Sequence, residues 1–217
     1  MAWLEPIPNL HLRHSDHTYW LGEHLFHKST TGVLSFSKGR VALAQIEATR
    51  SEWAPRGTAI HKALEVGLLA RFHPDGDRGA SEALLAAPEF DPYREWIDPL
   101  LSHHLWDAVQ VCASEMALCD LDRNIAGTFD GAYETPTGTR VLFDLKTQKR
   151  PDASPYCTKA QLGCYIGMAE ASGLHFDRAV TIWSKPGRVM VQRHPRDECL
   201  AAWEKAWDAY AEARLAL

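Results

Sequence analysis

Two aspartates, Asp130 and Asp144, have the type and spacing of a metal site because they flank the same tight turn. Residues 125–147 are expected to form a β-hairpin with a three-residue loop at 136–138, in which Gly138 takes the left-handed conformation. That loop sets a register in which the two aspartates face each other, with β-carbons about 4.5–5.5 Å apart. Facing carboxylates repel unless a cation lies between them, and oxygen ligands without thiolates suit Mg²⁺ or Mn²⁺. The hairpin therefore predicts a divalent-metal site.

A lysine, Lys146, follows Asp144 by two residues, so both side chains leave the strand on the same face. An ammonium group beside metal-bound carboxylates can orient or deprotonate an attacking water and stabilise the charge that develops on a phosphate. Asp-x-Lys alone is weakly informative, since about one chance match is expected in a chain of this size and composition. Here it is the only Asp/Glu-x-Lys in the sequence, and it lies on a strand that faces another aspartate.

Two pairs of polar residues, each four positions apart, flank the hairpin. His61 and Glu65 share a face of an expected helix, and Gln161 and Tyr165 share a face of a later one. A single helical histidine is more often a core or surface residue than a ligand, and Gln-x-x-x-Tyr is more often packing than function. Their order around the hairpin favours a functional interpretation.

The rest of the pattern predicts an α/β fold with a central mixed β-sheet flanked by helices. Hairpin signals occur over 17–27, around Gly22, and over 178–192, around Pro186 and Gly187. Pro55 is expected to end one helix before the next begins. Helices are predicted over 38–52, 59–71, 81–87, 93–108, 156–172 and 197–217, and further strands over 109–118, 125–134 and 139–147.

Composition indicates one folded domain. The chain of 217 residues is 46% hydrophobic and 24% charged, and it shows no internal repeat. We therefore expect a single domain over 1–217, with an N-terminal hairpin and helix over 1–56, a core over 57–192 and a closing helix over 193–217. The net charge of −5 does not favour a nucleic-acid partner, but residues 136–196 carry ten Lys/Arg against four Asp/Glu. A phosphate-binding face and ordinary surface charge both remain open there.

The cysteines and the N-terminus indicate the cellular compartment. Five cysteines without a CxxC pair disfavour a disulfide framework, a structural zinc site and an iron–sulfur cluster. Neither a secretory signal nor an apolar run of about eighteen residues is present, so a cytoplasmic location without a membrane span is expected. The histidines spaced by three at His11, His14 and His17 could bind a metal, although solvent-facing loop and hairpin positions are favoured. Trp203 and Trp207 are interpreted as core rather than as a base-stacking platform.

Together these residues make the chain resemble the RecB-like branch of the PD-(D/E)XK nucleases, including phage and prophage members. The resemblance covers roughly residues 57–165 and implies a restriction-endonuclease-like core. It rests on a series of four motifs: GTAIHKALE at 57–65, GTFD at 127–130, DLKT at 144–147 and QLGCY at 161–165. The chain departs from the family in lacking a proline before the first aspartate, iron–sulfur cysteines and a GxxxxGK[ST] helicase motif.

The resemblance implies roles for individual residues. His61, Asp130 and Asp144 would bind the metal with the backbone carbonyl of Leu145, and Lys146 would be the catalytic lysine. Residues that would contact DNA or support the ligands are Gln161, Tyr165, Glu65, Glu115 and Arg56, with Glu65 orienting Arg56 or His61. Lys149, directly after the catalytic strand, could grip a phosphate, and a solvated strand end is an equal alternative.

The function implied is a Mg²⁺- or Mn²⁺-dependent deoxyribonuclease that acts on single- or double-stranded DNA. The resemblance favours an exonuclease working on DNA ends in recombination, repair or phage replication. A structure-specific endonuclease and a non-catalytic DNA-binding or assembly module that keeps the fold are the alternatives. A recombination or single-strand-binding protein is the candidate protein partner, and the setting would be the bacterial cytoplasm, with a phage-encoded origin open. Polarity, processivity and oligomeric state are not predicted.

Overall fold

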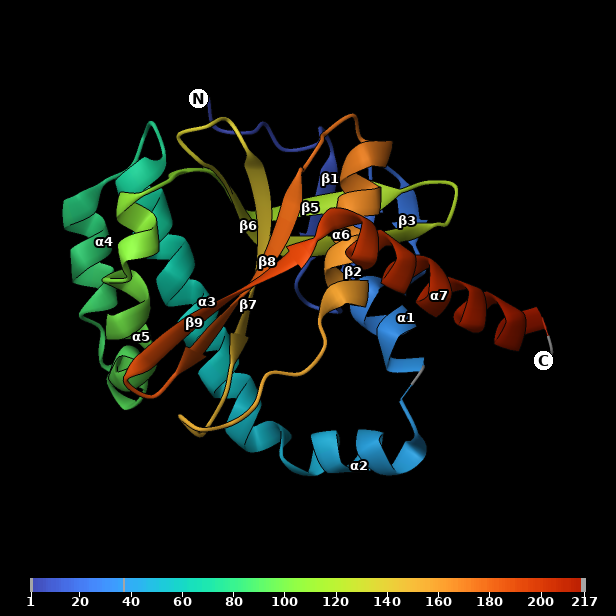
Figure 1. The fold of residues 1–217 in the computed structure, drawn as a ribbon, viewed down its shortest axis with the longest axis horizontal. Coiled ribbons are helices and arrows are strands. Elements are labelled where there is room, and N and C mark those ends of the chain that lie inside the picture. Colours follow the sequence, from blue (N-terminus) through green and yellow to red (C-terminus); the bar gives the residue numbers. More distant parts are fainter. Residues whose placement is uncertain (1, 37, 216–217) are drawn as a thin grey trace.

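The centre of the fold is a six-stranded mixed β-sheet. The structure is a computed structural model that describes residues 2–36 and 38–215, and Figure 1 shows its helices arranged around the sheet. Neighbouring strands follow the order β4-β6-β7-β8-β9, and β5 also pairs with β6. The β4–β6 and β7–β8 pairs are parallel and the others antiparallel. The strands are β4 (Lys28–Ser29), β5 (Gln110–Asp120), β6 (Ile125–Glu134), β7 (Arg140–Thr147), β8 (Arg178–Lys185) and β9 (Arg188–Pro195). The predicted α/β class with a mixed sheet is confirmed.

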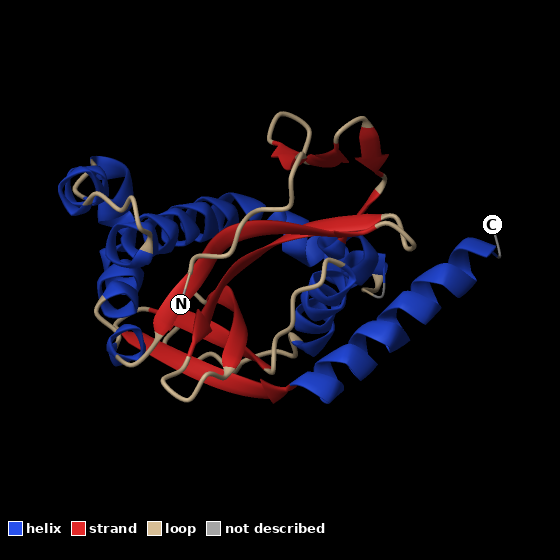
Figure 2. Cartoon of the chain, turned by 90° about the horizontal axis from the view of Figure 1, so that it is seen from above, coloured by secondary structure: helices blue, strands red, loops and turns tan. Residues whose placement is uncertain are grey.

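Helices lie on both sides of this sheet (Figure 2). The α-helices are α1 (Thr30–Phe36), α2 (Arg40–Ala48), α3 (Arg50–Phe72), α4 (Arg78–Leu85), α5 (Arg94–Leu101), α6 (Lys159–Ala171) and α7 (Arg196–Leu215). Two short 3₁₀ helices, η1 (Pro88–Tyr93) and η2 (His104–Asp107), flank α5. Within the described residues, no helix combines the length and the hydropathy needed to cross a membrane.

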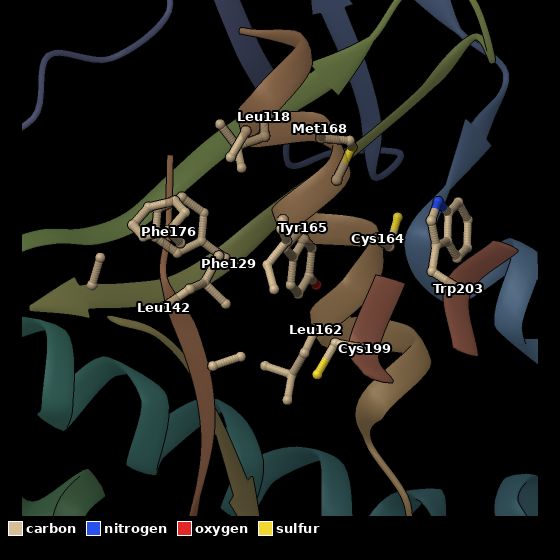
Figure 3. Close-up of a cluster of buried hydrophobic side chains, with 14 of the residues drawn as sticks. Leu118, Phe129, Leu142, Leu162, Cys164, Tyr165, Met168, Phe176, Cys199 and Trp203 are labelled. Atoms are coloured by element: carbon tan, nitrogen blue, oxygen red, sulfur yellow. The ribbon is translucent and has the colours of Figure 1, made fainter. Parts of the chain in front are cut away.

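One hydrophobic core lies between the sheet and α6, and α7 packs behind that helix (Figure 3). Phe129 and Leu142 of the sheet meet Leu162 of α6, and all three side chains are fully buried. Trp203 of α7 is 1% exposed, so its interpretation as a core residue is confirmed. The two helices pack closely at Gly163, where an added β-carbon would lie 2.0 Å from the Cys199 carbonyl oxygen.

A second hydrophobic core lies between the sheet, α3 and α5. Ile60 and Leu64 of α3 are buried with Ile97 of α5 against Phe143 and Leu145 of β7. Because successive residues of a strand point to opposite faces, β7 contributes to both cores and leaves Asp144 and Lys146 on the α6 side. The strand that carries the aspartate and the lysine is therefore held between helices on both faces.

The N-terminal segment forms a separate three-stranded sheet of β1 (Leu10–Arg13), β2 (Thr18–Leu21) and β3 (His24–Phe26). The hairpin predicted around Gly22 is confirmed, with a φ of 58° at that glycine. Strand β1 was not predicted. The Tyr19 hydroxyl lies 3.0 Å from the Thr128 hydroxyl, which links this small sheet to β6.

Several helix boundaries differ from the prediction, most clearly at Pro55, which lies inside α3 instead of ending a helix. A proline removes one backbone hydrogen bond, but tertiary packing provides most of a helix's stability in a folded protein. Burial of Arg56 and Ile60 just after the proline supplies that packing here. The helix predicted over 38–52 ends at Ala48, and the one predicted over 93–108 divides into α5 and η2.

The hairpin that carries the site follows the predicted register. Gly138 has a φ of 80°, and the Thr135 N–H donates to the Thr139 carbonyl at 2.9 Å. The described β6–β7 pairs run from Glu134 opposite Arg140 to Gly131 opposite Phe143. Asp130 and Asp144 lie one position beyond this last pair. Their adjacency was therefore predicted correctly, although the two strands no longer pair at the aspartates themselves.

Candidate metal centre

Three neighbouring strands place an acidic residue at the same level of the sheet. On β5 and β6, the pairs Ser114–Gly131 and Met116–Phe129 bracket Glu115 and Asp130. Asp144 follows on β7, one position past the last β6–β7 pair. Because neighbouring strands lie about 4.8 Å apart, the sheet itself collects three carboxylates.

A histidine from α3 completes the cluster on one side. The Nδ1 of His61 lies 3.1 Å from Oδ1 of Asp130 and 3.8 Å from Oε1 of Glu115. One ligand atom from each of these three residues lies within 4.8 Å of the other two. The Asp130 carboxylate is held from the sheet side, because the Leu145 N–H donates to its Oδ2. An imidazole nitrogen with two carboxylates is a donor set that suits Mn²⁺ and related divalent ions.

The predicted aspartate–lysine pair lies on β7 beside this cluster. The Lys146 Nζ is 3.0 Å from Oδ1 and 2.8 Å from Oδ2 of Asp144, which is 1% exposed. The contact to Oδ2 does not have hydrogen-bond geometry, so this buried oxygen lacks a hydrogen-bond partner. The structure thus groups Glu115, rather than the predicted Asp144, most closely with His61 and Asp130. The role predicted for the Leu145 carbonyl stays a prediction.

Charge compensation dominates the electrostatics of the centre. Burial alone would lower the pKa of His61, but the carboxylates of Asp130 and Glu115 raise it to about 10. Burial raises the pKa of Asp144 to about 6 against the opposing effect of Lys146. Burial opposes a low pKa for Asp130, yet the His61 and Lys146 cations keep that pKa below its ordinary value. Two cationic side chains, His61 and Lys146, therefore offset part of the negative charge of the three clustered acids.

Gln161 and Tyr165 lie on α6, as predicted, and bind each other. The amide Nε2 of Gln161 donates to the Tyr165 hydroxyl at 3.2 Å. Tyr165 is 5% exposed, and burial, together with the negative charges of Asp144 and Asp130, raises its pKa well above the ordinary value. The phenol therefore stays protonated next to the acids and can act as a neutral hydrogen-bond donor.

Glu65 and Arg56 occupy different surroundings from those predicted. Glu65 accepts a hydrogen bond from Lys62 at 2.8 Å, one turn away on α3. Arg56 reaches the Thr147 hydroxyl at 3.5 Å and lies over the Trp96 ring, 5.8 Å from its centroid. Arg56 thus ties α3 to the end of β7. Glu65 was predicted to orient Arg56 or His61, and its side-chain hydrogen bond in the structure comes from Lys62.

Lys149 lies just beyond β7 and forms an ion pair across to α3. Its Nζ is 2.6 Å from Oε2 of Glu52, and the two side chains are 69% and 57% exposed. An exposed pair of this kind contributes roughly 0–1 kcal/mol to stability. The contact joins the loop after β7 to the first turn of α3 and leaves the lysine accessible from solvent.

A cleft of about 830 Å³ opens onto the His61 side of the centre. Its walls come from the N-terminal segment, β1, α3 and β5, and both His61 and Glu115 line it. His11 and His14 of the N-terminal region also line the cleft, whereas none of the described histidines there joins the three-residue cluster. The centre is therefore reached from solvent between α3 and the small N-terminal sheet.

Two features of the centre were missed by the sequence analysis. Tyr156, 55% exposed, packs edge-on against Trp183 with centroids 4.8 Å apart, and Trp183 is the β8 partner of Lys146. Burial raises the pKa of Tyr156, and the nearby Lys146 ammonium opposes that rise. Glu115 has a φ of 46°, which is unusual for a strand residue other than glycine. No sequence motif marks either feature.

Comparisons with known proteins add little. No protein-family model and no curated protein matches the chain. A solved structure described as "Crystal structure of SSO0001" aligns with 86% of this chain and 79% of its own. The alignment has a TM-score of 0.39 and a sequence identity of 13%, which is too low to support a shared fold or activity.

Proposed function

We propose that the protein is a divalent-metal-dependent deoxyribonuclease of the PD-(D/E)XK type, with a restriction-endonuclease-like core. The observation that carries the proposal is the convergence of His61, Glu115 and Asp130 within 4.8 Å, beside the Lys146–Asp144 ion pair. Two carboxylates placed this close together repel each other, and a divalent cation held between them would offset that repulsion. The order of the sequence motifs supports a phosphodiester substrate, and the open cleft supports a polymer rather than an enclosed small molecule.

The donor set fits Mg²⁺ or Mn²⁺. His61, Glu115 and Asp130 would hold the ion, and the Oδ2 of Asp144 is a buried acceptor with no hydrogen-bond partner. Such an ion would supply a water of lowered pKa and a positive charge at the phosphate. The Asp130 carboxylate is oriented for this by the Leu145 N–H before any ligand arrives.

Lys146 is the side chain of the protein that would act directly on the reacting phosphate. Its ammonium is held by Asp144, and both aspartates favour its charged form, so its pKa lies above the ordinary value even though burial opposes this. A charged ammonium in this position orients a water and stabilises negative charge on a phosphate oxygen, and it does not act as a base near neutral pH. On α6, the protonated Tyr165 phenol accepts a hydrogen bond from the Gln161 amide, and burial together with the charges of Asp144 and Asp130, which lie near it, raises its pKa.

The proposal is tested with end-labelled single- and double-stranded DNA in Mg²⁺, Mn²⁺ or chelator. Asp144→Ala and Lys146→Ala are expected to reduce cleavage by about 10²-fold or more, because each removes a charge from the reacting centre. Asp197→Ala, at a site 93% exposed, and Lys205→Ala on the surface of α7 are the matched controls and should cleave normally. Equal cleavage by wild type and the two site variants would refute the assigned centre.

The finer proposal is an exonuclease that acts on DNA ends in recombination, repair or phage replication, in the cytoplasm of a bacterial host. Circular substrates test it. An exonuclease should leave closed circles intact while degrading the same DNA once it is linear, whereas cutting of circles would favour the structure-specific endonuclease.

A further inference from the structure

An exposed tyrosine, Tyr156, lies close to Lys146. It belongs to the segment 148–158, which joins β7 to α6, and it is 55% exposed. Its ring packs edge-on against Trp183, with the two ring planes at 85°. Trp183 is fully buried and is the β8 neighbour of Lys146, so both side chains leave the sheet on the same face. The tyrosine ring is thereby held beside the strand position that carries the ammonium.

The segment that carries Tyr156 is anchored to the sheet. The side-chain amide of Gln148 donates to the Ser154 carbonyl at 2.9 Å. Lys185 of β8, which is 3% exposed, donates to the Ala153 carbonyl, three residues before the tyrosine. A ligand that binds through an anchored side chain loses less free energy to ordering than one that must first order a loop. Tyr156 is therefore well placed to contact a ligand.

The hydroxyl of Tyr156 is a hydrogen-bond donor without a partner. No residue in the described part of the chain forms a hydrogen bond with it. Burial raises the pKa of the phenol, and the charge of Lys146 is the largest influence that opposes this rise. The phenol is therefore protonated at neutral pH and lies near enough to the ammonium to feel its charge. Together the two groups can donate to neighbouring oxygens of an anion.

The His61 side of the centre offers a phosphate much less. Among the described residues that line the cleft there, Lys62 is the one lysine or arginine, and it pairs with Glu65 at 2.8 Å. Glu65 and Glu115 add negative charge to the same walls. Apart from the metal proposed above, a phosphate finds no unpaired lysine or arginine on that side, whereas Tyr156 provides an unpaired donor on the other.

We propose that Tyr156 is a substrate-binding residue, whose hydroxyl donates to a non-bridging oxygen of the phosphate next to the one at Lys146. The inference rests on the proposed function, since it takes Lys146 as the group at the reacting phosphate. The phosphate bound by the phenol does not itself react, so this hydrogen bond has the same strength before and during the reaction. Its loss should therefore raise KM and leave kcat nearly unchanged.

The first measurement is the cleavage kinetics of Tyr156→Phe, which removes the hydroxyl and keeps the ring on Trp183. We expect a KM about tenfold higher than that of the wild type at nearly the same kcat, the effect of losing one hydrogen bond to a charged group. The melting temperature should not change. Tyr93→Phe is the matched control, because Tyr93 also packs edge-on against a tryptophan, Trp96, with centroids 6.5 Å apart, and its KM should equal that of the wild type.

The second measurement identifies the phosphate and does not require cleavage. Fluorescence anisotropy in chelator follows the binding of a labelled DNA of about 20 nucleotides, as a single strand and as a duplex. One phosphate at a time is replaced by a methylphosphonate, which lacks the charged oxygen. At one position the wild type should lose about tenfold more affinity than Tyr156→Phe does, because the variant has no hydroxyl to be deprived of a partner.

The outcomes separate this inference from the proposed function. Cleavage by the wild type with the same KM in Tyr156→Phe, a loss of kcat alone, or an equal rise of KM in Tyr93→Phe would overturn the inference and leave the nuclease standing. If the wild type cleaves no DNA with either metal, the nuclease is refuted and binding decides. Equal affinity of the wild type and Tyr156→Phe, or no binding at all, would then overturn the inference as well.

Discussion

The backbone conformation of Glu115 provides a test of whether β5 holds this side chain in place for a functional site. Its φ of 46° lies in the left-handed region, which is unfavourable by about 1–2 kcal/mol for residues other than glycine. The flanking residues Ser114 and Met116 stay paired with β6, so the strand does not end there. A strained residue inside a paired strand is retained when its side chain is needed, and this one aims a carboxylate at His61.

The strain predicts an inverted response to glycine. In an ordinary strand, glycine is less stable than alanine by roughly 0.5–1 kcal/mol, and Ala117→Gly on the same strand should show this. At position 115, relief of the left-handed strain exceeds that loss, so Glu115→Gly should be more stable than Glu115→Ala by about 1 kcal/mol. For a chain of this size that difference corresponds to about 2–4 °C in melting temperature.

The assay is thermal or urea unfolding of the three variants in chelator and then with Mn²⁺. Both Glu115 variants should lose most of the Mn²⁺-induced stabilisation, because each lacks one of the three proposed ligands, while Ala117→Gly should retain it. A Glu115→Gly protein less stable than Glu115→Ala would refute the strain. Full Mn²⁺ stabilisation in both would remove Glu115 from the centre.

Two further predictions concern pH and packing. The folded pKa of His61, about 10, exceeds its ordinary value of 6.5, so its protonated form stabilises the metal-free protein fully below pH 6.5 and loses that effect as pH rises toward 10. Urea unfolding in chelator at pH 6.5 and 9.5 should show a fall in stability that is smaller in His61→Gln, and an equal fall in both proteins would contradict the assignment. Gly163→Ala should destabilise by roughly 1–3 kcal/mol, since its β-carbon would clash with the Cys199 carbonyl at 2.0 Å. Gly167→Ala on the same helix, whose nearest neighbour would be 3.9 Å away, is the control and should be neutral or stabilising in the same melts.

Local signals predicted the elements that lie near the site. The glycine turn at Gly138 set the β6–β7 register because a short loop leaves few ways to pair two strands. The helix boundary at Pro55 was misjudged for the opposite reason: a local rule was overridden by burial of the residues that follow. Strand β1 carried too weak a pattern to be recognised, and its pairing with β2 depends on contacts outside its own residues.

The sequence predicted which residues belong to the candidate site better than it predicted which of them are in contact. Asp130, Asp144 and Lys146 were found from spacing because one hairpin carries all three. The close contact of Glu115 with His61 could not be found that way, since it joins β5 to α3 through the tertiary fold. Glu65 was predicted to orient Arg56 or His61, and its hydrogen bond from Lys62 was not predicted, because helical spacing places both Lys62 and His61 beside it and does not choose between them.

The structure also changes how the two aspartates divide their tasks under the proposed function. Facing carboxylates alone would require a cation, but Lys146 already compensates Asp144, and protonated His61 compensates Asp130. Asp130 is fixed by the Leu145 N–H and lies beside His61 and Glu115, the two proposed ligands that line the cleft, so it belongs to the accessible half of the centre. Asp144 is almost fully buried and keeps one oxygen on the lysine, so its first task is to hold that ammonium in place. Loss of Asp144 should therefore impair catalysis more than metal affinity, whereas loss of Asp130 should impair both.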